Sequence, residues 1–321
     1  MNIVYLFLTY KNPELLLHTI QRLKAPHVEF YVHVDASSGE DFSCLQGIEG
    51  VYVPVNQYNT KWGGYEIAFT ILYCLRDIQR RCHADYIILM SESDYPIKSN
   101  WYIRQTLAEK RKDFITITPL PHPNPLHTPE GHWLEGGRRR YECYALRLKA
   151  NSLATIEPKR FDLGNFRQFV KVMRDNPAKL LRALRIFWRY YPRRKHPEYL
   201  RPCGGELWFI LRGETVDKIV DFCARHPDYL DYCKDTAILD ELFIPTLVNY
   251  LVPESERENS TLRYINWQEN GGSSPAYLTM NDKKLLTECI LEPDKLFVRK
   301  VQDMEVCHFI DQTVREHYIN P

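Results

Sequence analysis

Short apolar runs alternate with amphipathic segments along the first ninety residues. The apolar runs predict four strands, at residues 3–9, 29–35, 51–55 and 85–90. Segments 13–23 and 65–79 repeat apolar residues with the period of a helix. The run at 85–90 is continuously apolar after Asp85, which is typical of a strand buried on both faces. Strand, helix and strand in this order predict an α/β fold with a mostly parallel central sheet flanked by helices.

Polar and aromatic residues follow several of these predicted strands. In open α/β sheets, ligands bind beyond the carboxyl ends of the strands. We therefore expect Tyr10, Asp35, Trp62 and the turn 91–94 to line one crevice of nucleotide size. Two alternatives remain from the residues alone: Asp35 caps the turn that follows it, through Ser37 and Ser38, and Trp62 is a core tryptophan.

The character of the chain changes between residues 117 and 200. Five prolines between 119 and 129 precede the basic run Arg138-Arg139-Arg140, which either binds an anionic acceptor or is surface charge. After Gly204 the β/α pattern resumes, with strands predicted at 207–211 and 262–267 and helices at 214–225 and 236–249. We expect one domain over 1–321: a nucleotide-binding half (1–116), an inserted basic and aromatic region on the acceptor side or serving as a lid (117–200), and a catalytic half (201–321).

Composition limits the class of protein. The chain has 321 residues, of which 44% are hydrophobic and 26% charged, enough for a large core. A net charge of +1 gives no general attraction for nucleic acid, so no nucleic-acid partner is expected. The apolar N-terminus lacks the features of a signal peptide and no run approaches a membrane span, so we expect a cytoplasmic protein. Nine cysteines without a CxxC pair predict reduced thiols.

Residues 179–195 form a basic and aromatic segment with helical spacing. One side of this predicted helix is basic, with Lys179, Arg182, Arg185 and Arg189, and Arg193-Arg194-Lys195 follows. The other side is apolar, with Leu180, Leu184, Phe187, Trp188 and Tyr191. The pattern has two interpretations: a surface helix packed on the core, or an interfacial helix at the cytoplasmic face of a membrane. The second would suit a lipid-linked saccharide as acceptor.

The last third of the chain contains a carboxylate, Glu241, and a cation, Lys300, that are candidates for catalysis. Glycosyl transfer without a metal needs a base for the acceptor hydroxyl and a cation for the departing diphosphate. Glu241 follows Asp240 in an apolar segment, and Lys300 ends an alternating run, 296–300, that predicts an edge or near-edge strand. The alternatives are acids at a helix N-terminus near Thr236 and a solvated lysine.

Glu92 and Asp94 form a second acidic pair, at the end of a predicted strand. Two such carboxylates together with a diphosphate can hold Mg²⁺ or Mn²⁺. A metal-dependent glycosyltransferase that uses Glu92 and Asp94 is therefore an alternative function. Lys98 follows closely in the sequence and disfavours a cation site there.

Five blocks together resemble the core-2/I-branching β-1,6-N-acetylglucosaminyltransferase family, which also includes peptide O-xylosyltransferases. The blocks are Tyr31-Val32-His33-Val34-Asp35, Lys61-Trp62-Gly63-Gly64-Tyr65, residues 89–99 with Ser91-Glu92-Ser93-Asp94-Tyr95-Pro96, Gly204-Gly205-Glu206-Leu207-Trp208-Phe209, and Asp240-Glu241 through Phe297-Val298-Arg299-Lys300. They cover residues 3–110 and 203–303 and leave the middle third unmatched.

The resemblance implies a GT-A-like nucleotide-sugar fold and an inverting transfer from a UDP-sugar to a hydroxyl of a glycan, without a metal cofactor. It implies Glu241 as the catalytic base and Lys300 on the donor diphosphate. The other expected donor residues are Leu8, Tyr10, Asp35, Trp62, Ser91, Asp94 and Arg299, and the expected acceptor residues are Glu206, Trp208, Asp240 and Trp267.

One departure from the family pattern concerns the diphosphate. Some members carry a second arginine just before the final strand, where this chain has Ser273-Ser274-Pro275-Ala276-Tyr277. Arg299, Arg263 or a basic residue of the middle region then assists Lys300. The donor sugar stays open among N-acetylglucosamine, xylose and glucuronic acid. We expect a role in bacterial surface polysaccharide synthesis; a catalytically silent glycan- or nucleotide-binding module is the alternative outside enzymes.

Overall fold

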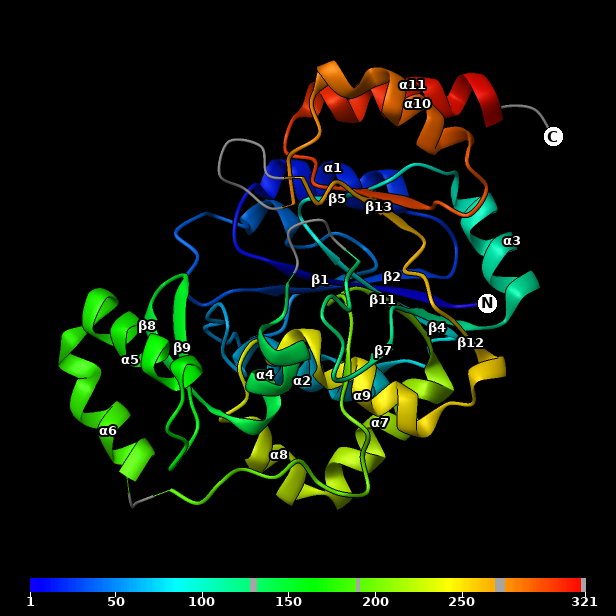
Figure 1. The fold of residues 1–321 in the computed structure, drawn as a ribbon. Coiled ribbons are helices and arrows are strands. Elements are labelled where there is room, and N and C mark those ends of the chain that lie inside the picture. The colour runs from blue at the N-terminus through cyan, green and yellow to red at the C-terminus, as the bar shows by residue number, and fades with distance from the viewer. Residues whose placement is uncertain (128–131, 189–190, 269–274, 319–321) are drawn as a thin grey trace.

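A seven-stranded sheet forms the centre of the molecule (Figure 1). The computed structural model describes residues 1–127, 132–188, 191–268 and 275–318. The strands are β1 (Ile3–Thr9), β2 (Val28–Val34), β3 (Val51–Tyr52), β4 (Tyr86–Ser91), β6 (Asp113–Ile115), β11 (Phe209–Arg212) and β12 (Arg257–Glu258), in the order β12-β6-β11-β4-β1-β2-β3. All of them are parallel except β11, which runs against both β4 and β6.

Helices cover both faces of this sheet, as the sequence pattern predicts. On one face lie α2 (Glu66–Arg81), α7 (Gly213–Arg225) and α9 (Phe243–Leu251), and on the other lie α1 (Pro13–Leu23) and α3 (Asn100–Lys110). The central strands β1 and β4 are buried along nearly their whole length because both faces are covered. The α/β class with a mostly parallel central sheet is therefore confirmed.

A second, three-stranded sheet packs beside the first. It has the order β13-β14-β5, formed by β13 (Arg263–Ile265), β14 (Phe297–Arg299) and β5 (Asp94–Pro96), and α10 (Lys283–Leu291) and α11 (Met304–Tyr318) cover it. The prediction of an edge or near-edge strand at 296–300 is confirmed in its second form, because β14 is the middle strand of only three. β14 lies between its two neighbours, and Phe297 and Val298 are buried, because the run has apolar contacts on both sides.

The middle of the chain builds a projecting unit at one side of the molecule, on the left in Figure 1. A hairpin of β8 (Tyr144–Lys149) and β9 (Ser152–Ile156) packs against α5 (Leu163–Asp175) and α6 (Leu180–Trp188) around an apolar cluster of its own. The remaining elements are η1 (Ser43–Leu45), β7 (Thr118–Pro119), η2 (Leu134–Gly137), α4 (Arg138–Glu142), η3 (Pro177–Lys179), β10 (Cys203–Gly204), α8 (Pro227–Cys233), η4 (Leu239–Glu241), η5 (Glu254–Glu256) and η6 (Met280–Asp282).

The helix predicted at 236–249 is broken. A short 3₁₀ turn, η4, precedes α9, and Ile238 before that turn has a left-handed backbone with φ of 50°. The Ile238 N–H donates to the carbonyl of Gly63 at 3.0 Å. The acidic pair 240–241 therefore lies in a turn fixed by tertiary contacts, not in the first turn of a helix.

Two further features bear on the expected class. Across the described ranges, no helix has the length and apolar character needed to cross a bilayer. All nine cysteines are free thiols, and seven of them are buried.

Candidate active site

The carboxyl ends of β1, β2 and β4 meet at one edge of the central sheet. Leu8 is in register with both His33 and Ser91, so these three strands end side by side. Tyr10 follows β1 and is largely exposed, as is Trp62 in the loop before α2. Two aromatic side chains expected to contact a nucleotide are therefore open to solvent, which leaves their rings available for stacking.

Asp35 shapes the loop beyond β2. One carboxylate oxygen accepts hydrogen bonds from the Ser37 backbone N–H (2.8 Å) and hydroxyl (2.5 Å), and the other accepts from the N–H (2.7 Å) and hydroxyl of Thr60. Burial favours a higher pKa for Asp35, but these hydrogen bonds outweigh it and lower the pKa below its usual value. The contacts are those of the turn-capping alternative through Ser37. The Ser38 hydroxyl donates instead to the carbonyl of Tyr10.

Asp94 lies at the centre of a buried network of charges. Its Oδ1 accepts from Arg263 Nε at 2.9 Å, and its Oδ2 accepts from Arg299 Nη1 at 3.0 Å. The backbone N–H and hydroxyl of Ser91 also donate to Oδ2, at 2.7 and 2.8 Å. The side chains of Asp94 and Arg263 are fully buried. Two guanidinium groups thus compensate a single carboxylate, and the immediate group carries net positive charge.

Trp208 lies beneath these cations. Its ring is 4.2 Å from the guanidinium carbon of Arg299 and 5.1 Å from that of Arg263. The tryptophan is buried, so its contacts are with the arginines and not with an open acceptor surface. Nη1 of Arg263 is buried and has no hydrogen-bond partner in the described part of the chain.

Lys300 extends the positive group outward from β14. Burial, followed by the positive charge of Arg299, lowers the pKa of Lys300 to about 8. Its ammonium lies 5.4 Å from the centre of the Tyr277 ring, and the Tyr277 hydroxyl accepts a hydrogen bond from Lys11 at 3.0 Å. Lys11 was missed in the sequence; its position directly after the first strand and Tyr10 was the available signal.

Glu241 faces a different arginine, from the middle region. Its Oε2 forms an ion pair with Nη1 of Arg140, whose guanidinium lies flat against Trp133, 3.2 Å from the ring centre. The stacking fixes the arginine, and the arginine fixes one oxygen of Glu241. For Arg140, the structure therefore supports neither of the two predicted roles, a solvated surface charge or a binding site for an anionic acceptor.

Main-chain hydrogen bonds fix the turn that carries Glu241. The carbonyl of Glu241 accepts from the Gly205 N–H at 2.9 Å, while Ile238 before it is bonded to Gly63. A β-carbon on Gly205 would lie 1.9 Å from the carbonyl oxygen of Thr116, so only glycine fits there. Three of the sequence blocks, around Gly63, Gly205 and Glu241, thus meet at one place.

The neighbouring carboxyls have altered proton affinity. Burial, followed by the charge of Glu241, raises the pKa of Asp240 to about 7, and its Oδ1 has no hydrogen-bond partner among the described residues. Burial also raises the pKa of Glu206, with a smaller contribution from Glu241. Glu206 accepts from the Thr261 hydroxyl at 3.0 Å and also senses the charge of Arg263. It therefore links the acidic side of the site to the basic side.

One further residue expected on the acceptor side, Trp267, is described by the structure. Trp267 follows β13 and is partly buried. Ser273 and Ser274, at the position of the missing arginine, lie outside the described residues; Arg263 and Arg299 are the arginines that the structure brings to this region.

The Glu92 and Asp94 pair does not form a good cation site. Asp94 already receives two guanidinium groups and two donors from Ser91, and the ammonium of Lys300 senses the charges of both acids. A divalent cation needs oxygen ligands that are free of competing positive charge. Among the described residues no group of three or more acidic, histidine or cysteine side chains has an arrangement for a metal ion. Lys98 donates instead to the carbonyl of Ile290, within the core.

Three other basic residues of the middle region have structural contacts. Arg138 pairs with Glu135, Glu142 and Glu157, and the buried Arg139 donates to Thr155 and Asn165. Arg194 is buried and donates to the carbonyls of Cys143, Tyr232 and Asp235. The expectation that 193–195 continues a basic surface helix was therefore wrong for Arg194, because α6 ends at Trp188 and Arg194 turns inward; Arg189 lies outside the described residues.

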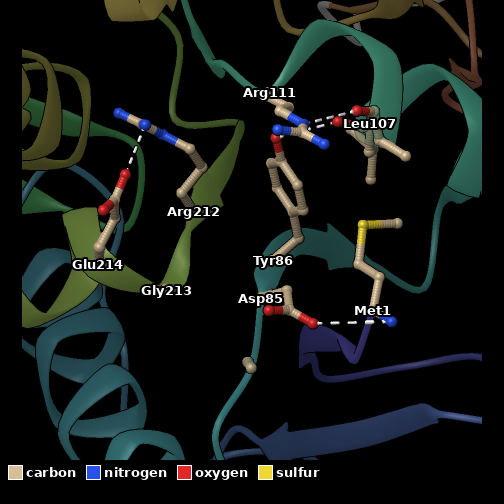
Figure 2. A pocket seen from close by; sticks show the side chains of 10 residues that line it. Met1, Asp85, Tyr86, Leu107, Arg111, Arg212, Gly213 and Glu214 are labelled. Carbon is tan, nitrogen blue, oxygen red and sulfur yellow. Dashed lines mark hydrogen bonds and ion pairs between the residues drawn. The ribbon is translucent and has the colours of Figure 1, made fainter.

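A cavity of about 610 Å³ lies at the opposite edge of the sheet, where β1 and β4 begin (Figure 2). Four of its charged groups form two ion pairs, Arg212 with Glu214 and the Met1 amino group with Asp85, and Arg111 also lines it and donates to the carbonyl of Ala108. Parallel strands present their ligand sites at the other end. We therefore assign the functional site to the carboxyl edge.

A family model covers most of the chain and decides its relationship. The Core-2/I-Branching enzyme model matches residues 3–127 and 163–290. The chain belongs to this glycosyltransferase family. The match extends into the middle third, which the sequence blocks left unmatched, and leaves a gap at 128–162 that contains Arg140. The match ends before Arg299 and Lys300. The family model therefore gives no information on Arg140, Arg299 or Lys300.

Curated relatives match shorter stretches. The chain is 29% identical over 105 residues to a Drosophila melanogaster protein named xylosyltransferase oxt, a match that covers 31% of this chain and 11% of the relative. It is 31% identical over 94 residues to the Caenorhabditis elegans xylosyltransferase sqv-6, with coverage of 27% and 12%. Since only about a tenth of each relative is matched, the activity of this chain is argued from its own site.

Solved structures show distant similarity. Residues 1–349 of Staphylococcus aureus TarS match with a TM-score of 0.29 and 13% identity, over 47% of this chain and 43% of that one. A Bacillus anthracis protein described as a putative glucose-1-phosphate thymidylyltransferase matches with a TM-score of 0.29 and 8% identity, over 72% and 84%. These scores are too low to support an argument, and the fold class rests on the sheet described above.

Proposed function

We propose that this protein is an inverting glycosyltransferase that moves a sugar from a UDP-sugar to a hydroxyl of a glycan without a metal ion. The observation that carries the proposal is that a carboxylate and a group of cations lie on two sides of one site, in a chain of this glycosyltransferase family. Glu241, fixed by Arg140, forms the acidic side, and Arg263, Arg299 and Lys300 form the basic side. Glu206 lies between them and senses both.

Glu241 is the base in this proposal. Its Oε2 is held by Arg140, so Oε1 takes the proton of the acceptor hydroxyl as that oxygen attacks C1 of the sugar. The bond from C1 to the β-phosphate oxygen breaks, and UDP leaves on the opposite face. Attack and departure on opposite faces invert the anomeric carbon.

The cations of the small sheet receive the leaving diphosphate. Lys300 and Arg299 balance the charge that develops on the β-phosphate, while Arg263 holds Asp94 and thereby the position of Arg299. Tyr10 and Trp62 are exposed rings beside the strand ends and supply stacking surfaces for the uracil or the sugar. Substituting fixed side-chain cations for a divalent ion is sufficient when they are partly desolvated, as Lys300 is.

The identity of the substrates follows from the family and not from a contact in this chain. N-Acetylglucosamine and xylose are the donor sugars we propose first, and a glycan, free or lipid-linked, is the acceptor. A cytoplasmic location and a role in bacterial surface polysaccharide synthesis stay predictions.

The test measures UDP release from a panel of UDP-sugars in EDTA, with and without glycan acceptors. Glu241→Gln should lower kcat by roughly 10²- to 10⁴-fold, the usual contribution of a general base, and leave UDP affinity unchanged. The matched control is Glu66→Gln. Glu66 pairs with Arg147 at 3.0 Å, and its side chain is 25% exposed against 23% for Glu241, so this variant also breaks a Glu–Arg contact with the middle region.

Three outcomes separate the alternatives. Loss of turnover in Glu241→Gln but not in Glu66→Gln supports the base. Equal loss in both variants would mean that anchoring the middle region matters and not the base. UDP binding without turnover of any donor by the unaltered protein would favour a silent glycan- or nucleotide-binding module.

A further inference from the structure

The outer surface of the projecting unit is apolar where a surface helix should be polar. Four exposed apolar residues, Leu163, Phe166, Val170 and Met173, recur along α5 at spacings of three, four and three residues. They therefore form one stripe on one side of the helix. The side of α5 that faces the protein carries Asn165 and Gln168, both buried. The usual distribution of a globular helix, apolar inside and polar outside, is partly reversed.

The neighbouring helix repeats the pattern. Leu181, Leu184 and Trp188 are exposed and spaced by three and four residues along α6, while Ala183, Ile186 and Phe187 point inward. Leu163 is 72% exposed, Phe166 64% and Trp188 54%. Two adjacent helices thus present parallel apolar stripes to solvent, and no part of the chain that the structure describes covers them.

The two stripes join in an apolar hollow of about 330 Å³. Phe161, Phe166 and Phe169 line it from the side of α5, and Leu184, Phe187 and Trp188 line it from α6. The rings pack on one another, with Phe161 4.9 Å from Phe187 and 5.9 Å from Trp188, centre to centre. Exposed rings held in place by other rings form a prepared surface.

Basic residues flank the stripes. Arg167 on α5, and Arg182 and Arg185 on α6, are exposed at positions adjacent to the apolar stripe along each helix turn. Arg174 on α5 is exposed too, but it forms an ion pair with Asp175 at 2.8 Å. Residues 159–188 contain eight Lys and Arg against two Asp, a net charge of +6, whereas the whole chain has a net charge of +1. The positive charge of the molecule is therefore concentrated in the same segment as its exposed apolar side chains.

We propose that α5 and α6 form a docking surface for an anionic phospholipid bilayer, with the apolar stripes inserted at the interface and the arginines against the lipid phosphates. Apolar rings flanked by basic side chains match the two layers of a membrane surface, acyl chains below anionic headgroups. A protein partner or a second copy would need complementary acidic residues around an apolar centre. The charge asymmetry favours the bilayer, because an anionic surface attracts every exposed arginine at once.

The docking surface is connected to the candidate active site. β8 of this unit carries Arg147, which pairs with Glu66 and also donates to the carbonyl of Lys61, the residue before Trp62. Arg140, which pairs with Glu241, lies on α4, directly before β8 in the chain. A bilayer bound at α5 and α6 would place the site next to acceptors that are anchored in lipid. The docking itself does not depend on the reaction at Glu241.

The experiment is flotation of the full chain with vesicles of phosphatidylcholine, with and without phosphatidylglycerol, at low and high salt. We expect binding to the anionic vesicles that weakens in high salt. Trp188→Ala should weaken it roughly tenfold, the loss expected for one large aromatic side chain. Trp101→Ala is the matched control, since Trp101 on α3 is 61% exposed and lies on the other side of the molecule (Figure 1).

Charge reversal tests the second half of the surface. Arg182→Glu with Arg185→Glu should abolish the preference for anionic vesicles, whereas Arg80→Glu with Lys284→Glu, an equal change at exposed positions elsewhere, should reduce it much less. Circular dichroism of each variant establishes that it is folded. Failure to float, or equal effects of paired variants, would overturn the proposal.

A second copy is the main competing occupant. A dimer in analytical ultracentrifugation that Trp188→Ala dissociates, without vesicle binding, would assign this surface to self-association instead. Because flotation requires no turnover, its result is independent of whether a UDP-sugar is consumed.

Discussion

Two acidic pairs in this chain are both candidates for chemistry, and they have different surroundings. Glu92 and Asp94 follow β4, and Asp240 and Glu241 form the turn before α9. Asp94 is compensated by two arginines and two donors of Ser91. In the pair 240–241 the structure describes a single arginine contact, from Arg140 to Glu241. Among the described residues, both Asp240 Oδ1 and Glu92 Oε2 are buried without a hydrogen-bond partner, so the two pairs differ in their cations.

The difference shows which acid has a structural role and which acid is available to a substrate. An acid held by the buried Arg263 and the partly buried Arg299 is a fixed part of the fold, because moving it would leave an uncompensated charge inside the protein. An acid held by one stacked arginine at a partly open site retains an oxygen for a substrate. The role of each pair is therefore decided by the side chains that surround it and not by its spacing in the sequence.

The largest expected effect comes from breaking the first pair. Asp94→Asn leaves Arg263 buried without its counter-ion and should lower the free energy of unfolding by about 3–5 kcal/mol. Glu241→Gln, in a partly exposed ion pair, should lower it by less than about 1 kcal/mol. Urea denaturation followed by circular dichroism measures both. Similar losses for the two variants would remove the contrast between the pairs.

The basic side of the site should lose donor affinity as the pH rises. Burial and Arg299 lower the pKa of Lys300 to about 8, so its charge is present below that pH and lost above it. The Kd for UDP should rise about tenfold between about pH 7 and about pH 9, as one charge-assisted hydrogen bond is lost. Calorimetric titration of Lys300→Met should give weak binding at both pH values. The exposed Lys283→Met serves as control; a pH step that survives in Lys300→Met would assign it to another group.

Asp240 is expected to have a smaller effect, on the free energy of unfolding, and its replacement should stabilise the protein. Burial and the charge of Glu241 raise its pKa to about 7. Between the ordinary pKa of an aspartate and about pH 7, the folded chain therefore holds a proton that the unfolded chain has released. The free energy of unfolding falls as the pH rises through this range. Asp240→Asn should raise the free energy of unfolding at about pH 8 by about 1–2 kcal/mol, and the gain should shrink toward about pH 5. A gain independent of pH would contradict the assignment.

The smallest expected effect is that of a divalent metal. Because Asp94 is already bound by Arg263 and Arg299, turnover of the best UDP-sugar should be the same in EDTA as in added Mn²⁺. Strong stimulation by Mn²⁺ that disappears in Glu92→Gln would restore the metal-dependent alternative and reverse the comparison between the two acidic pairs.

The sequence by itself determined the central layers. The helix predicted at 13–23 and the strand at 3–9 have those bounds in the structure, and the strand at 85–90 is displaced by one residue. These elements are set by local periodicity and by burial on both faces, which the order of residues records directly. The carboxyl edge as the ligand end follows from the same parallel order.

The tertiary structure alone decided how the charged groups are paired. The break before Glu241 depends on the carbonyl of Gly63, and its partner Arg140 comes from a segment with no local signal for that contact. The burial of Arg263 against Asp94, and the exposure of the apolar side of α5, likewise depend on which surfaces meet. Periodicity identifies the apolar side of a helix, but only packing of the whole chain determines which sides are covered and which charges are left to act.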